Sequence, residues 1–346
     1  MQDVWQAVLE KSSAQIANDK VEHFGQPESE IAAVNTANVI CDLSHLGIIR
    51  VSGTDAKDFL QNQLTNDVHQ VSATQSQLNA YCNPKGRILA SFRLFMRDGD
   101  YIMHMPWTII DPTLNRLKMF VLRSQVELKD SSDDWIRIGV AGQESEKLIT
   151  DQLGDCPQQL DEVMQIESAT VIRLPGTLPR FELHAPVDKM QSLWQALSQQ
   201  ATPVGASCWS HLDILAGIPV IQTQTTDSFV PQMVNLHVIN GVSFKKGCYP
   251  GQEIVARMQY LGKLKRRMYL AHVNTDATIN PGDELFSSGD NKQSIGKVVE
   301  AATAFTGGYD LLAVIQIAEQ TKADVLLHNK QGAKLEFHDL PYQVEE

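Results

Sequence analysis

Hairpins interrupt an alternation of strands and helices along this chain, and that interruption most constrains the fold. Alternating apolar runs predict strands at 78–82 and 87–95, joined by the turn sequence Asn83-Pro84-Lys85-Gly86. Comparable patterns continue along the chain and predict strands at 101–105, 135–141, 163–174 and 180–184, and helices at 144–153 and 187–198. Adjacent antiparallel strands favour α+β units of the β-α-β-β-α type over a doubly wound parallel sheet.

The character of the sequence changes beyond Lys265. Short apolar runs lie between turn sequences such as Pro281-Gly282-Asp283 and Thr306-Gly307-Gly308. Short strands with turns of this kind predict a separate C-terminal domain, a small β-barrel or sandwich. At the other end of the chain, residues 4–18 predict a short amphipathic helix.

The composition argues against several classes of protein. With 43% hydrophobic and 20% charged residues among 346, the chain is globular and long enough for two or three domains. A net charge of −12 argues against a phosphate-binding surface over the whole protein. No apolar run of about 18 residues is present, so no transmembrane helix is expected. Residues 1–20 lack the pattern of a secretory signal.

The five cysteines are odd in number, widely spaced and without a CxxC pair, which indicates a reducing compartment rather than a disulfide framework. We therefore expect a cytoplasmic protein. Cys41, Cys82 and Cys208 lie in apolar strand or helix patterns, and Cys156 precedes a proline in a loop. None of these four cysteines is predicted to be a reactive group.

The most unusual stretch runs from Ser243 to Arg257, with the sequence SFKKGCYPGQEIVAR. Tyr249-Pro250-Gly251 predicts a tight turn, and residues 252–259 predict a helix. Cys248 would then precede a helix N-terminus beside two lysines, and both the helix dipole and these cations favour a thiolate. The alternative is a buried, inert cysteine in a structural turn.

Other polar features are weaker signals. Glu253 and Arg257 are four residues apart and can pair on one helix face. The turn at 83–87 could meet an anionic substrate, but we interpret it as a solvated hairpin tip. The basic run 263–267 fits either contact with RNA phosphates or a charged linker. The polar residues between 61 and 67 could cap a helix or face a pocket.

Several kinds of site have no support in the sequence. The ten histidines are scattered without an HExxH pair, so we expect no metal site. One cysteine cannot hold an iron–sulfur cluster, which takes four protein ligands. No G-x-S-x-G, Walker A or G-x-G-x-x-G motif is present. Trp209, near the start of a predicted helix, is either a core residue or a ring that stacks on a flat ligand.

The segment Lys246-Gly247-Cys248-Tyr249-Pro250-Gly251-Gln252-Glu253 resembles the K-G-C-[FY]-x-G-Q-E motif of the YgfZ family, the tRNA-modifying, folate-binding proteins. It matches that motif at every fixed position. The resemblance extends to residues 51–68, 216–220, 229–236 and 340–342. It covers nearly the whole chain apart from residues 1–35.

The family is similar to the aminomethyltransferase of the glycine cleavage system. This similarity implies an α+β fold of three domains around a central folate pocket, with two α+β domains related to ferredoxin-like units and a small C-terminal β-barrel. We expect an N-terminal extension at 1–35 and the first, folate-binding-type domain at 36–130. The second α+β domain, ending in the KGCYPGQE motif, is expected at 131–262, and the barrel at 263–346.

The resemblance also implies the ligand, which is tetrahydrofolate or a related folate, and it implies no metal bound by this chain alone. A family tryptophan at the folate pocket matches Trp209, and a second family tryptophan aligns with Leu46. The further residues expected at the folate site are Asn235, Tyr249, Glu253 and Arg257.

The general acid/base of the aminomethyltransferase is an aspartate in a hairpin strand that corresponds to residues 86–91 here. Ala90 and Ser91 replace the acids of that strand. The chain therefore lacks the carboxylate that aminomethyl transfer requires, whereas folate binding does not require one.

The function that the resemblance implies is support of iron–sulfur enzymes and, through them, tRNA modification such as methylthiolation. Cys248 is expected to act as the reactive thiol and Lys246 as the cation that favours its thiolate. The expected partners are folate, iron–sulfur enzymes or their assembly factors and, indirectly, tRNA, with no membrane. The alternatives are a folate-dependent aminomethyl or one-carbon transferase and a direct tRNA-binding protein.

Overall fold

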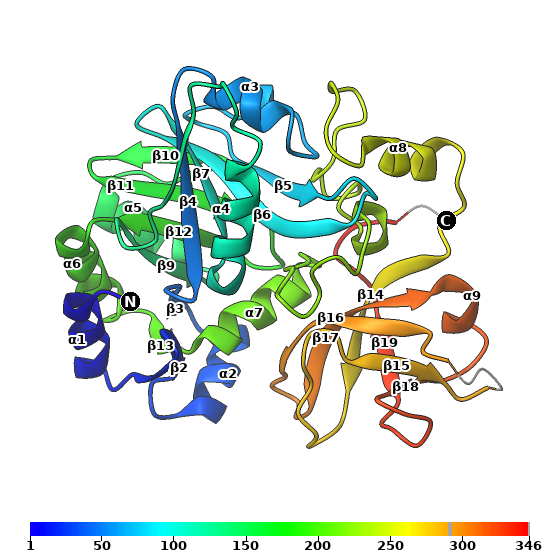
Figure 1. The fold of residues 1–346 in the computed structure, drawn as a ribbon. Coiled ribbons are helices and arrows are strands. Elements are labelled where there is room, and N and C mark those ends of the chain that lie inside the picture. Colours follow the sequence, from blue (N-terminus) through cyan, green and yellow to red (C-terminus); the bar gives the residue numbers. More distant parts are fainter. Residues whose placement is uncertain (290–292, 345–346) are drawn as a thin grey trace. The chain divides into compact units, whose positions relative to one another are not determined.

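The structure is a computed structural model that describes residues 1–289 and 293–344 (Figure 1). The chain forms two compact units, each built from segments that are distant in the sequence. Unit 1 contains residues 1–56, 69–77 and 93–212, and unit 2 contains residues 57–68, 78–92 and 213–346. Each unit has buried apolar clusters of its own.

Unit 1 contains a six-stranded sheet with the strand order β10-β11-β12-β9-β3-β13, in which only the β13–β3 pair is parallel. Its strands are β3 (Val39–Asp42), β9 (Ile136–Ala141), β10 (Val163–Ile166), β11 (Ala169–Leu174), β12 (Arg180–Ala185) and β13 (Thr202–Val204). Alternation along β12 places Phe181 and Leu183 in one apolar cluster, so Glu182 and His184 face the opposite side of the sheet.

A second sheet has the strand order β5-β6-β7-β4-β8. Its strands are β4 (Leu46–Ser52), β5 (Gln77–Cys82), β6 (Ile88–Arg97), β7 (Asp100–Pro106) and β8 (Glu127–Asp130). In unit 1, Ile48 of β4 and Ile102 of β7 share an apolar cluster with Ile172 of β11. The cluster therefore lies between these strands and the six-stranded sheet. The predicted strands at 78–82, 87–95 and 101–105 are confirmed.

The helices of unit 1 surround these strands. They are α1 (Asp3–Lys11), α2 (Pro27–Thr36), α4 (Ile110–Lys118), α5 (Ser145–Leu153), α6 (Val187–Leu197) and most of α7 (Ala206–Leu215), with the 3-10 turn η2 (Trp107–Ile109). Trp5 of α1 packs edge-on against Trp194 of α6, with ring centres 5.6 Å apart. The N-terminal residues thus contribute to the core of unit 1.

Two element predictions are wrong. The helix expected at 4–18 ends at Lys11, because Ser13 adopts a φ of 71° and the chain turns into the hairpin of β1 (Gln15–Ala17) and β2 (Lys20–His23). The single strand expected at 163–174 is a hairpin of β10 and β11, with Glu167 in the turn at a φ of 52°. Left-handed residues other than glycine leave little trace in an apolar pattern.

Unit 2 contains a six-stranded antiparallel sheet with the order β18-β15-β16-β17-β14-β19, drawn in yellow to red in Figure 1. Its strands are β14 (Arg266–Val273), β15 (Glu284–Ser287), β16 (Gly296–Thr303), β17 (Tyr309–Gln316), β18 (Val325–Leu327) and β19 (Leu335–His338). A single bridge links Leu326 to Lys334. The α+β class and the predominance of short strands in the C-terminal part are confirmed.

The remaining elements of unit 2 carry the candidate site. They are α3 (Ala56–Gln61), which begins at the last residue of a unit 1 segment, α8 (Gln252–Tyr260), α9 (Ile317–Gln320), and the 3-10 turns η1 (Val68–Gln70) and η3 (Pro231–Val234). Among the described residues, no helix is both long enough and apolar enough to cross a membrane.

Candidate functional site

Residues 246–253, which we call the cysteine turn, lead into α8 within unit 2. Cys248 is exposed, whereas the neighbouring Tyr249 is buried. Gly251 is the N-cap residue of α8 and has a φ of 82°, which glycine adopts without a Cβ penalty. Cys248 therefore lies at the surface just before a helix N-terminus, and the alternative of a buried cysteine is wrong.

The cysteine turn packs against the hairpin turn between β5 and β6. A Cβ atom on Gly251 would lie 2.4 Å from the Asn83 carbonyl oxygen and 2.6 Å from the Gly86 backbone. Gly86 is itself buried with a φ of 70°. The two glycines allow direct backbone contact, so the interpretation of 83–87 as a solvated tip holds for the exposed Lys85 but not for Gly86.

Lys246 ties the cysteine turn to the segment that follows α3. Its ammonium group donates hydrogen bonds to the carbonyl oxygens of Gln61, Leu64 and Asn66, at 2.7, 2.5 and 2.8 Å. It also lies 5.3 Å from the centre of the Tyr249 ring. Burial lowers the pKa of Lys246 to about 8, and the carboxylate of Asp67 opposes that shift.

This geometry gives Lys246 a positioning role. An ammonium group has three N–H donors, and the three carbonyl oxygens match that number. The role predicted for Lys246, as the cation that favours a Cys248 thiolate, remains a prediction. The carbonyl contacts had no sequence signal, because they come from backbone atoms that any residue carries.

Two glutamine side chains brace the same region. The Gln61 amide donates to Asp67 Oδ1 at 2.9 Å, and Gln61 Oε1 accepts from the Val68 backbone N–H at 2.8 Å. The capping role considered for the polar residues between 61 and 67 is therefore confirmed for Gln61. Gln252 of α8 donates to the carbonyl of Gly247 at 3.3 Å. The Tyr249 carbonyl after Cys248 accepts from the Gln252 backbone N–H at 3.2 Å, so the backbone is held on both sides of Cys248 while that residue stays exposed.

The other four cysteines have the opposite setting. Cys41, Cys82, Cys156 and Cys208 form no disulfide and have exposed fractions of 3% or less. Burial raises the pKa of the Cys156 and Cys208 thiols to about 12, and it raises the pKa of Cys82 as well. These thiols are core groups, as their apolar sequence contexts predicted for three of them.

Trp209 is a core residue of unit 1, with an exposed fraction of 1%. A Cβ atom on Gly139 of β9 would lie 2.3 Å from the Trp209 ring, so this glycine makes room for the indole. The guanidinium of Arg180 lies 5.5 Å from the ring centre. Leu46 packs against the same apolar cluster. Stacking of Trp209 on a ligand remains a prediction, and it requires displacement of one of these neighbours.

The remaining predicted folate residues belong to unit 2. Asn235 is fully buried and donates to the Met268 carbonyl at 3.1 Å, while its Oδ1 atom has no hydrogen-bond partner. Glu253 and Arg257 are exposed on α8. They form no ion pair with each other, so the pairing that their spacing allows is absent from the described side chains.

The strand that corresponds to the acidic strand of the aminomethyltransferase has no carboxylate in this chain. Ala90 on β6 is fully buried. The Ser91 hydroxyl donates to the Pro219 carbonyl at 3.2 Å and accepts from the Ile221 backbone N–H at 3.0 Å. Ser91 therefore joins the strand to the 219–221 segment and offers no general acid or base.

Comparison with known proteins places these observations in context. Residues 11–246 match the family model described as the GCVT N-terminal domain. The fold resembles that of the glycine cleavage system aminomethyltransferase T from Bartonella henselae, with a TM-score of 0.78 and 16% identity over 98% of this chain and 96% of that one.

Curated relatives carry the name tRNA-modifying protein YgfZ. The protein from Colwellia psychrerythraea is 32% identical over 80% of this chain and 85% of its own length. The protein from Yersinia enterocolitica is 30% identical over 89% of this chain and 93% of its own length. With the intact KGCYPGQE sequence and the GCVT N-terminal domain, these matches show that the chain belongs to the YgfZ family.

Proposed function

We propose that this protein is a folate-binding accessory protein that supports iron–sulfur enzymes, and through them tRNA modification, with Cys248 as its reactive group. The observation that carries the proposal is the contrast among the five cysteines. Cys248 alone is exposed, and it lies on a turn whose backbone is braced on both sides. A thiol in this position can reach a partner protein or a metal cluster, because the thiolate is a good metal ligand and nucleophile.

The relatives support the tRNA part of the proposal, since they are named tRNA-modifying proteins. An indirect role fits the net charge of −12 better than direct binding of tRNA, which requires cationic surface. The transferase alternative is disfavoured by Ala90 and Ser91, which leave the matching strand without a carboxylate. The same proposal includes three domains around a folate pocket, with boundaries after residues 35, 130 and 262. It also includes a cytoplasmic location.

The residues of unit 2 suit a folate in part. Asn235 offers a buried acceptor atom without a partner, which suits an N–H group of a pterin ring. Arg257 is exposed on α8 and suits the carboxylates of the glutamate tail. Trp209 fits less well, because its ring is already packed. Bound tetrahydrofolate would supply a carrier of one-carbon units.

Calorimetric titration of the full chain with tetrahydrofolate under reducing conditions tests the folate proposal. We expect saturable binding, weakened about tenfold in Arg257→Gln, which is about 1.4 kcal/mol. Lys263→Gln, another exposed cation, is the matched control and should leave the affinity unchanged. Equal affinity in both variants would remove Arg257 from the site, and absence of binding would reject folate as the ligand.

The role of Cys248 is tested in cells that lack their own copy of the protein. We expect the native chain to restore methylthiolated tRNA, measured by mass spectrometry of digested tRNA, and the activity of an iron–sulfur dehydratase. Cys248→Ser should restore neither, while Lys322→Gln, at an exposed lysine of unit 2 outside the cysteine turn, should restore both. Full restoration by Cys248→Ser would reject the thiol as the reactive group. Restored dehydratase activity without tRNA modification would reject the indirect route.

A further inference from the structure

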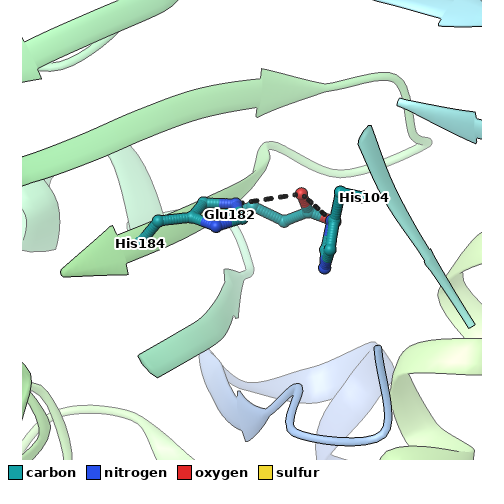
Figure 2. Close-up of side chains that lie close together, drawn as sticks. All are labelled: His104, Glu182 and His184. Carbon is teal, nitrogen blue, oxygen red and sulfur yellow. Dashed lines mark hydrogen bonds and ion pairs between the residues drawn. The ribbon is translucent and has the colours of Figure 1, made fainter. Parts of the chain in front are cut away.

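Three buried titratable side chains of unit 1 meet between strands of the five-stranded and the six-stranded sheet, and the proposed function does not use them. Figure 2 shows His104 from β7 directed towards Glu182 and His184 from β12. Their exposed fractions are 4%, 6% and 0%. Glu182 and His184 are two residues apart on one strand, so both face the same side of the sheet. We call these three residues the histidine–glutamate cluster.

The distances within the cluster suit ligands around one metal ion. His104 Nδ1 lies 3.2 Å from Glu182 Oε2, and His184 Nε2 lies 3.6 Å from the same oxygen. One ligand atom from each residue lies within 4.8 Å of the other two. Ligands bound tetrahedrally at ~2.1 Å from Zn²⁺ are about 3.4 Å apart, which falls between the two measured separations.

The hydrogen bonding of the cluster is incomplete. His184 Nε2 makes only the 3.6 Å contact to Glu182, which is longer than a hydrogen bond, and His184 Nδ1 and His104 Nε2 have no hydrogen-bond partner. A buried imidazole nitrogen without a hydrogen bond is costly, and such groups are few in native proteins. A metal ion would satisfy His184 Nε2 and strengthen the contact to Glu182, since imidazole and carboxylate groups are both zinc ligands. The polar groups point to a ligand that the polypeptide alone does not supply.

The surroundings favour a firmly held ion. Phe95 packs against His184, with ring centres 5.0 Å apart, and the two histidine rings are also 5.0 Å apart. Two arginines lie nearby: Arg97 donates to the His184 backbone carbonyl at 3.4 Å, and the Arg137 guanidinium donates to the carbonyls of Ser132 and Trp135. The described contacts of the Glu182 carboxylate are with His104 and His184 and not with these arginines.

We propose that His104, Glu182 and His184 bind one divalent transition-metal ion, with Zn²⁺ the best fit. Three protein ligands leave a fourth coordination position for a non-protein ligand. The ion would connect β7 of one sheet with β12 of the other and would stabilise unit 1. The sequence-based expectation of no metal differs from this proposal because it considered spacing along the chain, whereas these ligands come from two sheets.

The metal content of the full chain tests this proposal. Protein produced in medium containing Zn²⁺ should retain about one ion per chain after desalting, and Glu182→Gln and His184→Gln should each retain under about a tenth of that amount. His328→Gln is the matched control, since His328 pairs with Asp283 on the exposed surface of unit 2, and it should retain the ion. Retention by Glu182→Gln, or no ion in the native chain, would overturn the proposal.

A second measurement does not depend on the folding of any variant. The native chain produced with Co²⁺ in place of Zn²⁺ should show the intense visible absorption of a four-coordinate cobalt ion with nitrogen and oxygen ligands. Only the weak absorption of six-coordinate cobalt, removed by desalting, would indicate adventitious binding and would contradict the proposal. Neither readout depends on folate, on Cys248 or on tRNA modification.

Discussion

The cysteine turn and the histidine–glutamate cluster are opposites in how they treat polar groups. In the turn, Lys246 and Gln252 have their partners within the chain, and Cys248 is exposed. In the cluster, the side chains are buried and ring nitrogens of both histidines lack partners. The turn leaves a thiol exposed and the cluster leaves buried ring nitrogens without hydrogen bonds, so we propose an external partner for the first and a bound metal ion for the second. The two regions also belong to different units.

The largest effect is expected from Trp209→Ala, which would remove the indole from its place against Gly139. We expect a loss of about 3–5 kcal/mol in the free energy of unfolding, because the cavity lies in a well-packed core. Denaturant titration measures this loss. The contacts described above for the cysteine turn lie within unit 2, so the rate of Cys248 alkylation should not change. A large change in the alkylation rate would show that the cysteine turn is not independent of the packing around Trp209.

A smaller effect is expected from Gly251→Val. The residue would have to keep a left-handed φ, and its Cβ would meet the Asn83 carbonyl at 2.4 Å. We expect a loss of about 2–3 kcal/mol in the free energy of unfolding, or local displacement of the turn. Gly247→Val is the matched control, since a Cβ at Gly247 meets nothing within 4 Å. Similar losses in both variants would contradict the role assigned to Gly251.

Lys246→Met is expected to cost about 1–3 kcal/mol, because three backbone carbonyl groups lose their charged donor. Hydrogen exchange of the backbone between residues 61 and 68 should accelerate, which mass spectrometry of peptides can detect. Lys245→Met, at an exposed neighbour, should leave both quantities unchanged. Unchanged exchange in Lys246→Met would show that the carbonyl contacts do not hold the turn.

The last prediction concerns the pH dependence of stability. Burial lowers the pKa of Lys246 from 10.5 to about 8, so between these values the unfolded chain holds more protons than the folded one. The free energy of unfolding of the native chain, relative to Lys246→Met, should therefore rise with pH from about 8 to 10.5. Denaturant titrations at several pH values measure this difference. A flat or falling difference would contradict the effect of burial.

Local sequence patterns predicted much of the cysteine turn, because the tight turn, the helix at 252–259 and the place of Cys248 before that helix all depend on neighbouring residues. The backbone contacts of Lys246 and the packing of Gly86 against Gly251 were not predictable, since they join segments far apart in the chain. The histidine–glutamate cluster was missed for the same reason. Only the Glu182-x-His184 spacing on one strand gave a local signal.

The accessibility of each thiol tests the central claim most directly, namely that Cys248 is the sulfur presented to partners. The folded chain would be treated with a small alkylating reagent, and modification of each cysteine would be followed by mass spectrometry of peptides. We predict rapid modification of Cys248, with Cys41, Cys82, Cys156 and Cys208 modified only after unfolding. Protection of Cys248, or equally fast modification of any buried cysteine in the folded chain, would contradict the account.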